Sequence, residues 1–151
     1  EWMIEGGVQG LVVSGSTGEA ATCTVEERRQ LWAFVKERVK GRVWIVAGTG
    51  TNSTADSIAL TRMAEELGMD GAMVVTPFYN KPTPKGQAAH FAAVAKSTKL
   101  PVILYTGYGE DISAVELREA CIAQMVRKPI EPAEFFPLLA AHLPLRAASA
   151  P

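Results

Sequence analysis

Residues 43–68 read VWIVAGTGTNSTADSIALTRMAEELG and form one complete unit of strand, loop and helix. The apolar run at 43–46 has no polar alternation, which is typical of a parallel strand covered on both faces. The glycine-rich loop after it reaches Asn52 or Ser53, either of which is placed to cap a helix. That helix has an apolar stripe at steps of four residues, formed by Ala55, Ala59, Met63 and Leu67.

The same unit recurs along the chain. Apolar runs of the same kind lie at residues 11–13, 73–75 and 101–104, and each precedes a loop rich in Gly, Ser, Thr or Pro and then a helical pattern. Capping signals begin two of the helices: residues 24–27 have the spacing of a capping box, and residues 83–84 pair a threonine cap with a first-turn proline. Repeated strands and helices predict an α/β fold with a parallel sheet and right-handed crossovers.

Composition excludes several classes of protein. The chain has 151 residues, of which 48% are hydrophobic and 21% charged, so global disorder is excluded. A net charge of −1 lacks the basic excess of a nucleic-acid binder, and no apolar run approaches the ~18–20 residues of a membrane span. Cys23 and Cys121 are too few for a disulfide framework and favour a reducing, cytoplasmic setting. We therefore expect neither a nucleic-acid nor a membrane partner.

Loops at the carboxyl ends of parallel strands form the ligand sites of such folds. Residues 14–19 (SGSTGE) offer backbone N–H groups and, between the two glycines, the adjacent hydroxyls of Ser16 and Thr17, which suit a carboxylate; the alternative is a tight turn that needs glycine. No lysine follows these glycines, and Ser53 stands where residues 48–50 (GTG) would need the third glycine of a dinucleotide site. His90 and His142 have no Cys or carboxylate at ligand spacing, so we predict no cofactor and no metal.

Aromatic residues follow the third and fourth apolar runs. Phe78 and Tyr79 stand just past the third run, where packing is the commoner role of an aromatic pair. Tyr105 ends the fourth run and places a phenol at the mouth of the sheet. A phenol with a pKa near ~10 shuttles protons only when neighbouring groups orient its hydroxyl.

Four motifs together resemble one enzyme family. They lie at residues 15–19 (GSTGE), 47–50 (AGTG), 75–82 (VTPFYNKP) and 103–105 (ILY), in the order and register of the dihydrodipicolinate synthase and N-acetylneuraminate lyase family. The resemblance runs from about Trp2 to Ser113, and the stretch around Tyr79 favours the synthase branch. It implies a TIM (β/α)8 barrel that condenses pyruvate with an aldehyde through a lysine Schiff base in lysine biosynthesis, usually as a homotetramer.

The resemblance also implies a role for each of five residues. Thr17, with Gly15 beside it, would bind the pyruvate carboxylate through its hydroxyl and backbone N–H. Ser16, Tyr105 and Tyr79 match the family's proton relay. Tyr105 would pass protons to and from the Schiff-base intermediate, and Tyr79 would reach in from a neighbouring subunit. A serine and two phenols form a hydrogen-bonded chain that moves a proton without a free base.

Two departures from the family pattern lower the expected activity. Residues 106–110 (TGYGE) replace the loop whose arginine receives the carboxylate of the aldehyde. The strand with the Schiff-base lysine, roughly Gly-Ile-Lys-Glu in the family, is absent from the sequence. The nearest candidate is Lys128, which follows a candidate strand at 122–126; the alternative is an ordinary solvated lysine.

The length indicates about half a barrel. A (β/α)8 barrel takes about 250 residues. We predict a partial barrel of four to five βα units over residues 1–121 and a divergent tail over residues 122–151. Residues 126–135 are also similar to the Lys-Pro strand end and last helix of receiver domains, but no Asp stands at a strand end to accept phosphate. The start at Glu1, without a methionine, favours a piece of a longer protein.

An open half barrel exposes two sheet edges and an apolar inner face, which must be covered by association or by rearrangement into a flatter sheet. We therefore predict a homo-oligomer, an aggregation-prone monomer or a chain that pairs with a missing half-barrel. The functional hypothesis is a truncated, pyruvate-dependent class I lyase with little or no activity alone. The alternative is a non-catalytic α/β scaffold or fusion module derived from the same family.

Overall fold

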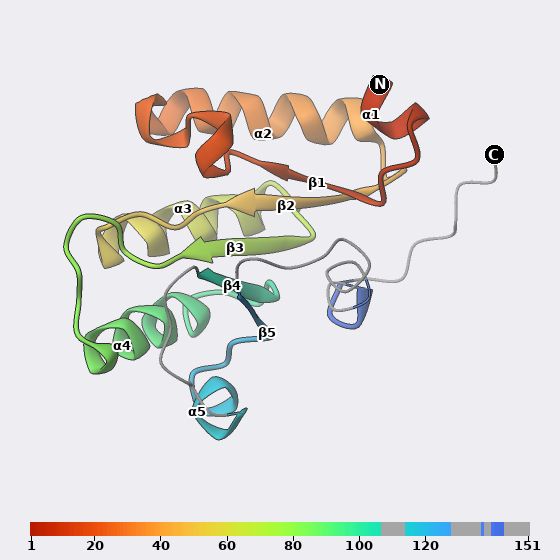
Figure 1. Cartoon of the computed structure of the whole chain (residues 1–151). Coiled ribbons are helices and arrows are strands. Elements are labelled where there is room, and N and C mark those ends of the chain that lie inside the picture. The colour runs from red at the N-terminus through yellow and green to blue at the C-terminus, as the bar shows by residue number, and fades with distance from the viewer. Residues whose placement is uncertain (107–113, 128–136, 138–139, 144–151) are drawn as a thin grey trace.

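The computed structural model describes residues 1–106, 114–127, 137 and 140–143 (Figure 1). Within them, one parallel sheet of five strands has the order β1-β2-β3-β4-β5. The strands are β1 (Gly10–Val13), β2 (Trp44–Gly48), β3 (Gly71–Val75), β4 (Val102–Thr106) and β5 (Gln124–Arg127). The helices are α1 (Trp2–Glu5), α2 (Val25–Val39), α3 (Thr54–Glu66), α4 (Pro84–Ala95) and α5 (Ala114–Glu119), with 3-10 turns at Ser16–Gly18 and Ala20–Thr22.

The sequential strand order is that of a barrel wall. Each strand pairs in parallel with the next one along the chain, and helices connect successive strands. This arrangement confirms the predicted α/β class with four to five βα units. The four apolar runs of the sequence all lie in or beside strands, and the candidate strand at 122–126 is β5, shifted by one or two residues. Within the described residues β1 pairs with β2 alone, so its other edge is open.

Alternate side chains of the strands point to opposite faces, and the helices cover the outer face. One buried cluster packs Val13, Ile45 and Ala47 against side chains of α2 and α3. A second packs Val74 and Leu104, among others, against α4. Trp32 on α2 and Phe91 on α4 are the largest fully buried side chains of these clusters. The outer face therefore contains most of the hydrophobic core.

The predicted apolar stripe of α3 is partly wrong. Ala55 and Ala59 are exposed, whereas Ser57 and Thr61 are fully buried. Thr61 reaches the buried side because its hydroxyl donates to Thr49 Oγ1 at 2.8 Å. Ser57 and Thr61, which the predicted stripe left out, are on the buried side, where hydrogen bonds within the fold satisfy their hydroxyls.

The helix starts follow the capping signals. Thr24 Oγ1 accepts from the backbone N–H of Glu27 at 3.2 Å, and the Glu27 carboxylate accepts from the N–H of Thr24 at 2.7 Å. These bonds complete the predicted capping box, and the bond from Thr24 lowers the pKa of Glu27. Ser53 caps α3, and Thr83 caps α4 ahead of Pro84.

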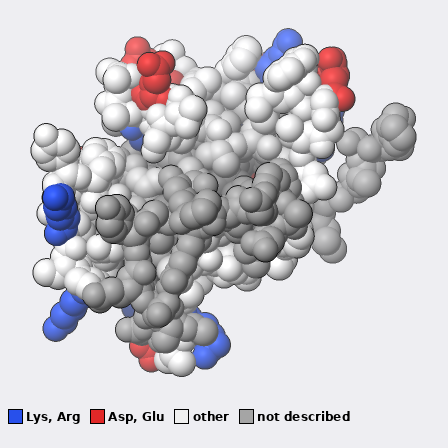
Figure 2. Space-filling view, viewed as in Figure 1, with Lys and Arg blue, Asp and Glu red and all other residues white. Residues whose placement is uncertain are grey.

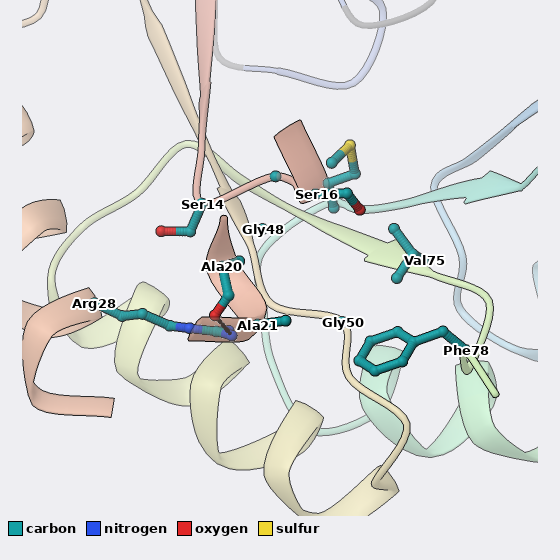
Figure 3. A pocket seen from close by; sticks show the side chains of 11 residues that line it. Ser14, Ser16, Ala20, Ala21, Arg28, Gly48, Gly50, Val75 and Phe78 are labelled. Carbon is teal, nitrogen blue, oxygen red and sulfur yellow. Dashed lines mark hydrogen bonds between the residues drawn. The ribbon is translucent and has the colours of Figure 1, made fainter. Parts of the chain in front are cut away.

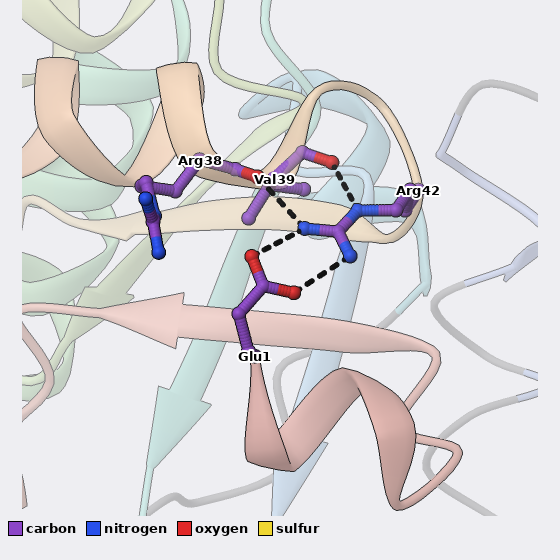
Figure 4. A network of polar contacts seen from close by, with 4 residues as sticks. All are labelled: Glu1, Arg38, Val39 and Arg42. Carbon is purple, nitrogen blue, oxygen red and sulfur yellow. Dashed lines mark hydrogen bonds and ion pairs between the residues drawn. The ribbon is translucent and has the colours of Figure 1, made fainter.

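An ion pair connects the first residue to the end of α2 (Figure 4). Arg42 donates to both carboxylate oxygens of Glu1 at 2.7 and 2.9 Å, and its Nε donates to the backbone oxygen of Val39 at 3.1 Å. The hydrogen bonds from Arg42 lower the pKa of Glu1 to about 2. The two-pronged geometry holds α1 beside the turn between α2 and β2.

On the face shown in Figure 2, the visible charged side chains are dispersed. In Figure 2, Lys, Arg, Asp and Glu side chains stand in small, separate groups near the margins of the visible face. Among the described helices none is long and apolar enough to cross a membrane. Cys23 and Cys121 are both free thiols.

The inner face is covered in part by the chain itself. Leu143, from the segment after β5, packs with Val46, Met73, Ile103 and Val126 and is only 5% exposed. At this place the inner face, which was expected to need covering, is covered by a residue of the same chain.

Candidate active site

A pocket of about 240 Å³ lies at the carboxyl ends of β1, β2 and β3 (Figure 3). The loop after β1, the 3-10 turn Ala20–Thr22, helix α2 and the ends of the next two strands all contribute to its wall. Its lining residues are Ser14, Gly15, Ser16, Ala20, Ala21, Arg28, Gly48, Gly50, Met73, Val75 and Phe78. A volume of this size suits a small organic ligand rather than a nucleotide or a macromolecule.

Two glycines bring the pocket walls together. A Cβ at Gly48 would lie 2.0 Å from the backbone oxygen of Ser14, and a Cβ at Gly50 would lie 2.5 Å from the backbone nitrogen of Val75. Any side chain at these positions would force the backbone apart. The AGTG motif is therefore needed for close backbone approach at the carboxyl end of the sheet.

Ser14 connects the pocket loop to α2. It is 7% exposed and adopts a left-handed φ of 60° directly after β1. Its hydroxyl accepts from the indole N–H of Trp32 at 3.0 Å. This buried bond fixes the start of the turn that carries Gly15 and Ser16.

Arg28 places a buried cation in the pocket wall. The residue is 7% exposed, and its Nη2 donates to the backbone oxygen of Ala20. Its Nη1 is buried and has no hydrogen-bond partner among the described residues. Figure 3 shows the guanidinium extending from α2 toward Ala20 and Ala21. A buried guanidinium with an unused donor favours an anion beside it, because an unpaired buried charge is costly.

The structure brings some of the expected site residues together. Gly15 and Ser16 both line the pocket, and Thr17 follows in the same 3-10 turn, exposed to solvent. The backbone of Tyr105, at the end of β4, lies opposite that of Val75, which lines the pocket. Lys128 lies outside the described residues.

Tyr79 stands apart from the pocket of its own chain. It is 97% exposed with a φ of 69°, while the preceding Phe78 lines the pocket and is 46% exposed. Packing within the chain therefore does not account for this aromatic pair. The amide of Asn80 donates to the backbone oxygen of Asn52 at 2.8 Å and ties the loop to the one before α3.

Sequence reasoning missed Arg28 and, within the candidate loop at residues 14–19, the hydrogen bond of Ser14 with Trp32. Arg28 precedes Trp32 by four residues and so belongs to the buried stripe of α2, where a charged residue is unusual. That position was a usable signal. Ser14 had no comparable signal, because its role depends on Trp32, a residue on the following helix. Among the described residues, no group of three or more His, Cys, Asp or Glu could hold a metal ion.

Comparison with known proteins decides the family. Residues 1–129 match the family model described as Dihydrodipicolinate synthetase family. The chain belongs to this family.

Relatives in this family extend well beyond the chain. A 4-hydroxy-tetrahydrodipicolinate synthase of Bacillus velezensis is 46% identical over 115 residues, which are 76% of this chain and 40% of that protein. The synthase of Magnetococcus marinus is 53% identical over 105 residues, 70% of this chain and 36% of that protein. The chain thus spans about 36–40% of the length of these curated relatives.

A solved structure of the family also matches. It is the chloride-inhibited dihydrodipicolinate synthase of Acinetobacter baumannii, complexed with pyruvate. The TM-score is 0.75 at 36% identity, covering 93% of this chain and 50% of that one. The five-stranded sheet of this chain therefore corresponds to part of a synthase fold in the Dihydrodipicolinate synthetase family.

Proposed function

We propose that this chain is the keto-acid-binding part of a 4-hydroxy-tetrahydrodipicolinate synthase-like class I lyase, with pyruvate as its ligand and little or no activity alone. The observation that carries the proposal is the pocket that joins Gly15 and Ser16 to the buried guanidinium of Arg28. Family membership supports a lyase, and the solved relative from Acinetobacter baumannii is described as complexed with pyruvate.

The pocket supplies what a carboxylate needs. The 3-10 turn Ser16–Gly18 follows Gly15, which has no side chain to cap it, so within the described residues the first backbone N–H groups of the turn are uncapped and suit a carboxylate. The hydroxyls of Ser16 and Thr17 lie on the same turn. Arg28 adds a positive charge in a wall from which water is largely excluded, where electrostatic attraction is stronger than in bulk water. Met73 and Val75 provide apolar contact for the methyl group of the keto acid.

The proposed reaction begins with a lysine amine. The amine adds to the keto carbon of pyruvate, water leaves, and an imine forms. Tyr105 then takes a proton from the methyl group while its own phenolic proton passes into the relay. The resulting enamine attacks the aldehyde carbon, and the aldehyde oxygen receives a proton from the relay. Water then adds to the imine and releases the product from the lysine amine. Ser16 and Tyr79 complete the proton relay. Lys128 is the candidate for the amine.

An exposed Tyr79 supports a shared site. A phenol that is 97% exposed on its own chain contributes little to the core of that chain, and its left-handed backbone projects it from the loop after β3. We propose that it completes the relay of a neighbouring copy. This role requires a homo-oligomer.

The alternative is a non-catalytic scaffold that keeps the loops. It is favoured by the replaced loop at 106–110 and by the absence of the family's lysine strand from these 151 residues. Under this alternative the Ser16–Gly18 turn is a structural turn and pyruvate does not bind.

Pyruvate titration followed by amide NMR separates the two hypotheses. We expect the signals of Gly15, Ser16 and Thr17 to shift on titration. In Thr17→Val the affinity should fall about tenfold, since a hydrogen bond to a charged group contributes about 1.5–3 kcal/mol. Gly18→Ala is the matched control, because nothing lies within 4 Å of a Cβ at that position. Unshifted signals at saturating pyruvate would support the scaffold.

Borohydride trapping tests the covalent step separately. Borohydride added with pyruvate reduces an imine to a stable adduct that mass spectrometry locates. An adduct on Lys128, lost in Lys128→Arg, assigns the nucleophile to this chain. Binding without an adduct assigns this chain to ligand binding and the amine to another part of the barrel.

A further inference from the structure

The first strand of the sheet is followed by a strained residue. Ser14 comes directly after β1 and has a left-handed φ of 60°, which residues other than glycine adopt only at a cost in free energy. It is buried and lines the pocket. Strain of this kind persists only where neighbouring groups hold the backbone in place, and it is commonest at ligand sites. Two residues next to Ser14, Gly48 and Trp32, explain how it persists here.

Gly48 on β2 leaves room for the strained backbone. A Cβ at this position would lie 2.0 Å from the backbone oxygen of Ser14 and 3.1 Å from the backbone nitrogen of Gly15. The peptide bond between Ser14 and Gly15 therefore lies directly against Gly48. That peptide leads into the 3-10 turn Ser16–Gly18, whose first N–H groups suit a carboxylate. Gly48 permits this arrangement, but it has no side chain with which to hold it.

Trp32 on α2 supplies the group that holds Ser14. The indole is fully buried, and its N–H donates to Ser14 Oγ at 3.0 Å. An indole nitrogen is a donor only, so the serine hydroxyl must be the acceptor. If the backbone of Ser14 relaxed to an extended conformation, its hydroxyl would move and the buried N–H would lose its acceptor, which is costly. The bond from Trp32 thus opposes relaxation of the strain.

The Ser14 side chain is an anchor rather than a ligand contact. Figure 3 shows its hydroxyl pointing away from Ser16, toward the side from which Arg28 extends. Arg28 and Trp32 are four residues apart and so lie on the same face of α2. One face of this helix therefore contributes both a cation to the pocket wall and a hydrogen bond to the loop after β1.

We infer that Trp32 is a positioning residue of the pocket: through the Ser14 hydroxyl, its indole N–H holds Ser14 in the left-handed conformation from which the Ser16–Gly18 turn is presented to a ligand. The inference rests on the proposed function for the identity of that ligand, a keto acid. Trp32 is not among the described residues that line the pocket, so it acts on affinity through Ser14. Its effect on pyruvate binding should therefore require the Ser14 hydroxyl.

A double-mutant cycle tests whether Trp32 acts through Ser14. Trp32→Phe keeps a large buried ring but removes the donor, and Ser14→Ala removes the acceptor. Each should weaken pyruvate binding about fivefold in the amide NMR titration, the factor expected for one ordinary hydrogen bond. The double variant should also bind about fivefold more weakly, because both substitutions remove the same bond. Losses that multiply to about 25-fold would assign Trp32 to packing alone and overturn the inference.

Trp44→Phe is the matched control for Trp32→Phe. Trp44 begins β2, at the amino end of the sheet, whereas the pocket lies at the carboxyl ends of the strands. The same substitution there should leave the affinity for pyruvate unchanged. A loss as large as that of Trp32→Phe would show that affinity follows general stability, and Trp32 would not be a positioning residue.

Spectra recorded without pyruvate cover the case in which Trp32→Phe does not fold. In the unmodified chain the indole N–H of Trp32 should exchange with solvent about tenfold more slowly than in Ser14→Ala, because this buried donor loses its partner in the variant. Ser14→Ala should also shift the amide signals of Thr17 and Gly18 more than Trp44→Phe does. Equal exchange rates and unshifted signals would overturn the inference.

These ligand-free measurements separate the inference from the proposed function. Slow indole exchange and shifted turn signals, in a chain whose spectrum did not respond to pyruvate, would contradict the proposed function and leave the positioning role of Trp32 in place. Pyruvate binding that is unaffected by Trp32→Phe and Ser14→Ala would contradict the positioning role and leave the proposed function in place.

Discussion

The two ends of the sheet differ in how completely their buried polar groups are hydrogen-bonded and how completely their apolar surface is covered. At the amino end, Asp70 accepts a buried hydrogen bond from the N–H of Ile45 at 2.8 Å, and Leu143 fills the inner face. At the carboxyl end, Arg28 Nη1 is buried without a partner among the described residues, and an open pocket lies beside it. The contacts at the amino end therefore stabilise the fold, whereas the carboxyl end has a hydrogen-bond donor and a pocket available to a ligand.

Gly48→Ala should cause the largest loss of stability, because it disrupts the close packing of β1 and β2 at the carboxyl end of the sheet. The new methyl group would lie 2.0 Å from the backbone oxygen of Ser14, so β1 and β2 must separate. We expect the free energy of unfolding to fall by about 3 kcal/mol, at the upper end for overpacking. Urea denaturation measures it. Gly18→Ala serves again as the control, and equal losses in the two variants would contradict the close approach.

Leu143→Ala tests the amino end. The residue is 5% exposed, and truncation leaves a cavity against Met73 and Ile103. We expect a loss of about 2 kcal/mol by urea denaturation, at the low end for a buried leucine because the segment can relax. Val115→Ala, at a position 53% exposed on α5, should change stability far less. A loss no larger than that of Val115→Ala would show that the amino end is as open as the carboxyl end.

Arg28→Leu sharpens the comparison, since stability should rise in this variant while the affinity for pyruvate falls. Removing a buried and incompletely paired cation should raise the free energy of unfolding by about 1 kcal/mol. The affinity for pyruvate should fall at the same time. Thermal unfolding and NMR titration measure the two effects. Arg29→Leu is the control, because Arg29 is exposed and makes only a 3.8 Å ion pair with Glu66. A destabilised Arg28→Leu with unchanged pyruvate affinity would assign Arg28 a structural role.

The pH dependence of stability should give the smallest effect. His90 Nδ1 lies 2.8 Å from Thr54 Oγ1 at the start of α3, and its Nε2 is buried without a partner among the described residues. Burial lowers the pKa of His90 below 6.5 in the folded state. The unfolded chain therefore takes up a proton first, and stability falls as the pH drops below about 6.5.

His90→Gln isolates this contribution, since it keeps a polar side chain that does not titrate. Between pH 7 and the folded pKa of His90, the decline in the urea midpoint should be shallower in the variant. Above pH 7, the residue at position 90 should contribute no pH dependence to the urea midpoint of either protein. Parallel profiles across the whole range would show that His90 is not the group responsible.

Many of the strands and helix starts could be predicted from short stretches of sequence. The strand at residues 43–46 and the capping box of Thr24 and Glu27 are local signals, because burial on both faces and capping chemistry each act within a few residues. The α3 stripe was predicted poorly, since hydropathy alone does not show that Thr61 pairs with Thr49. The GSTGE loop was identified as a candidate site, but the cation beside it was not.

By itself, the sequence determined a parallel α/β wall of about half a barrel and the family to which its loops belong. Only the tertiary structure decided that Arg28 faces the pocket with an unused donor and that Leu143 covers the inner face. The reason is physical. Strand and cap formation depend on neighbours in the chain, whereas the fate of a buried charge or an exposed apolar face depends on residues that meet only when the chain has folded.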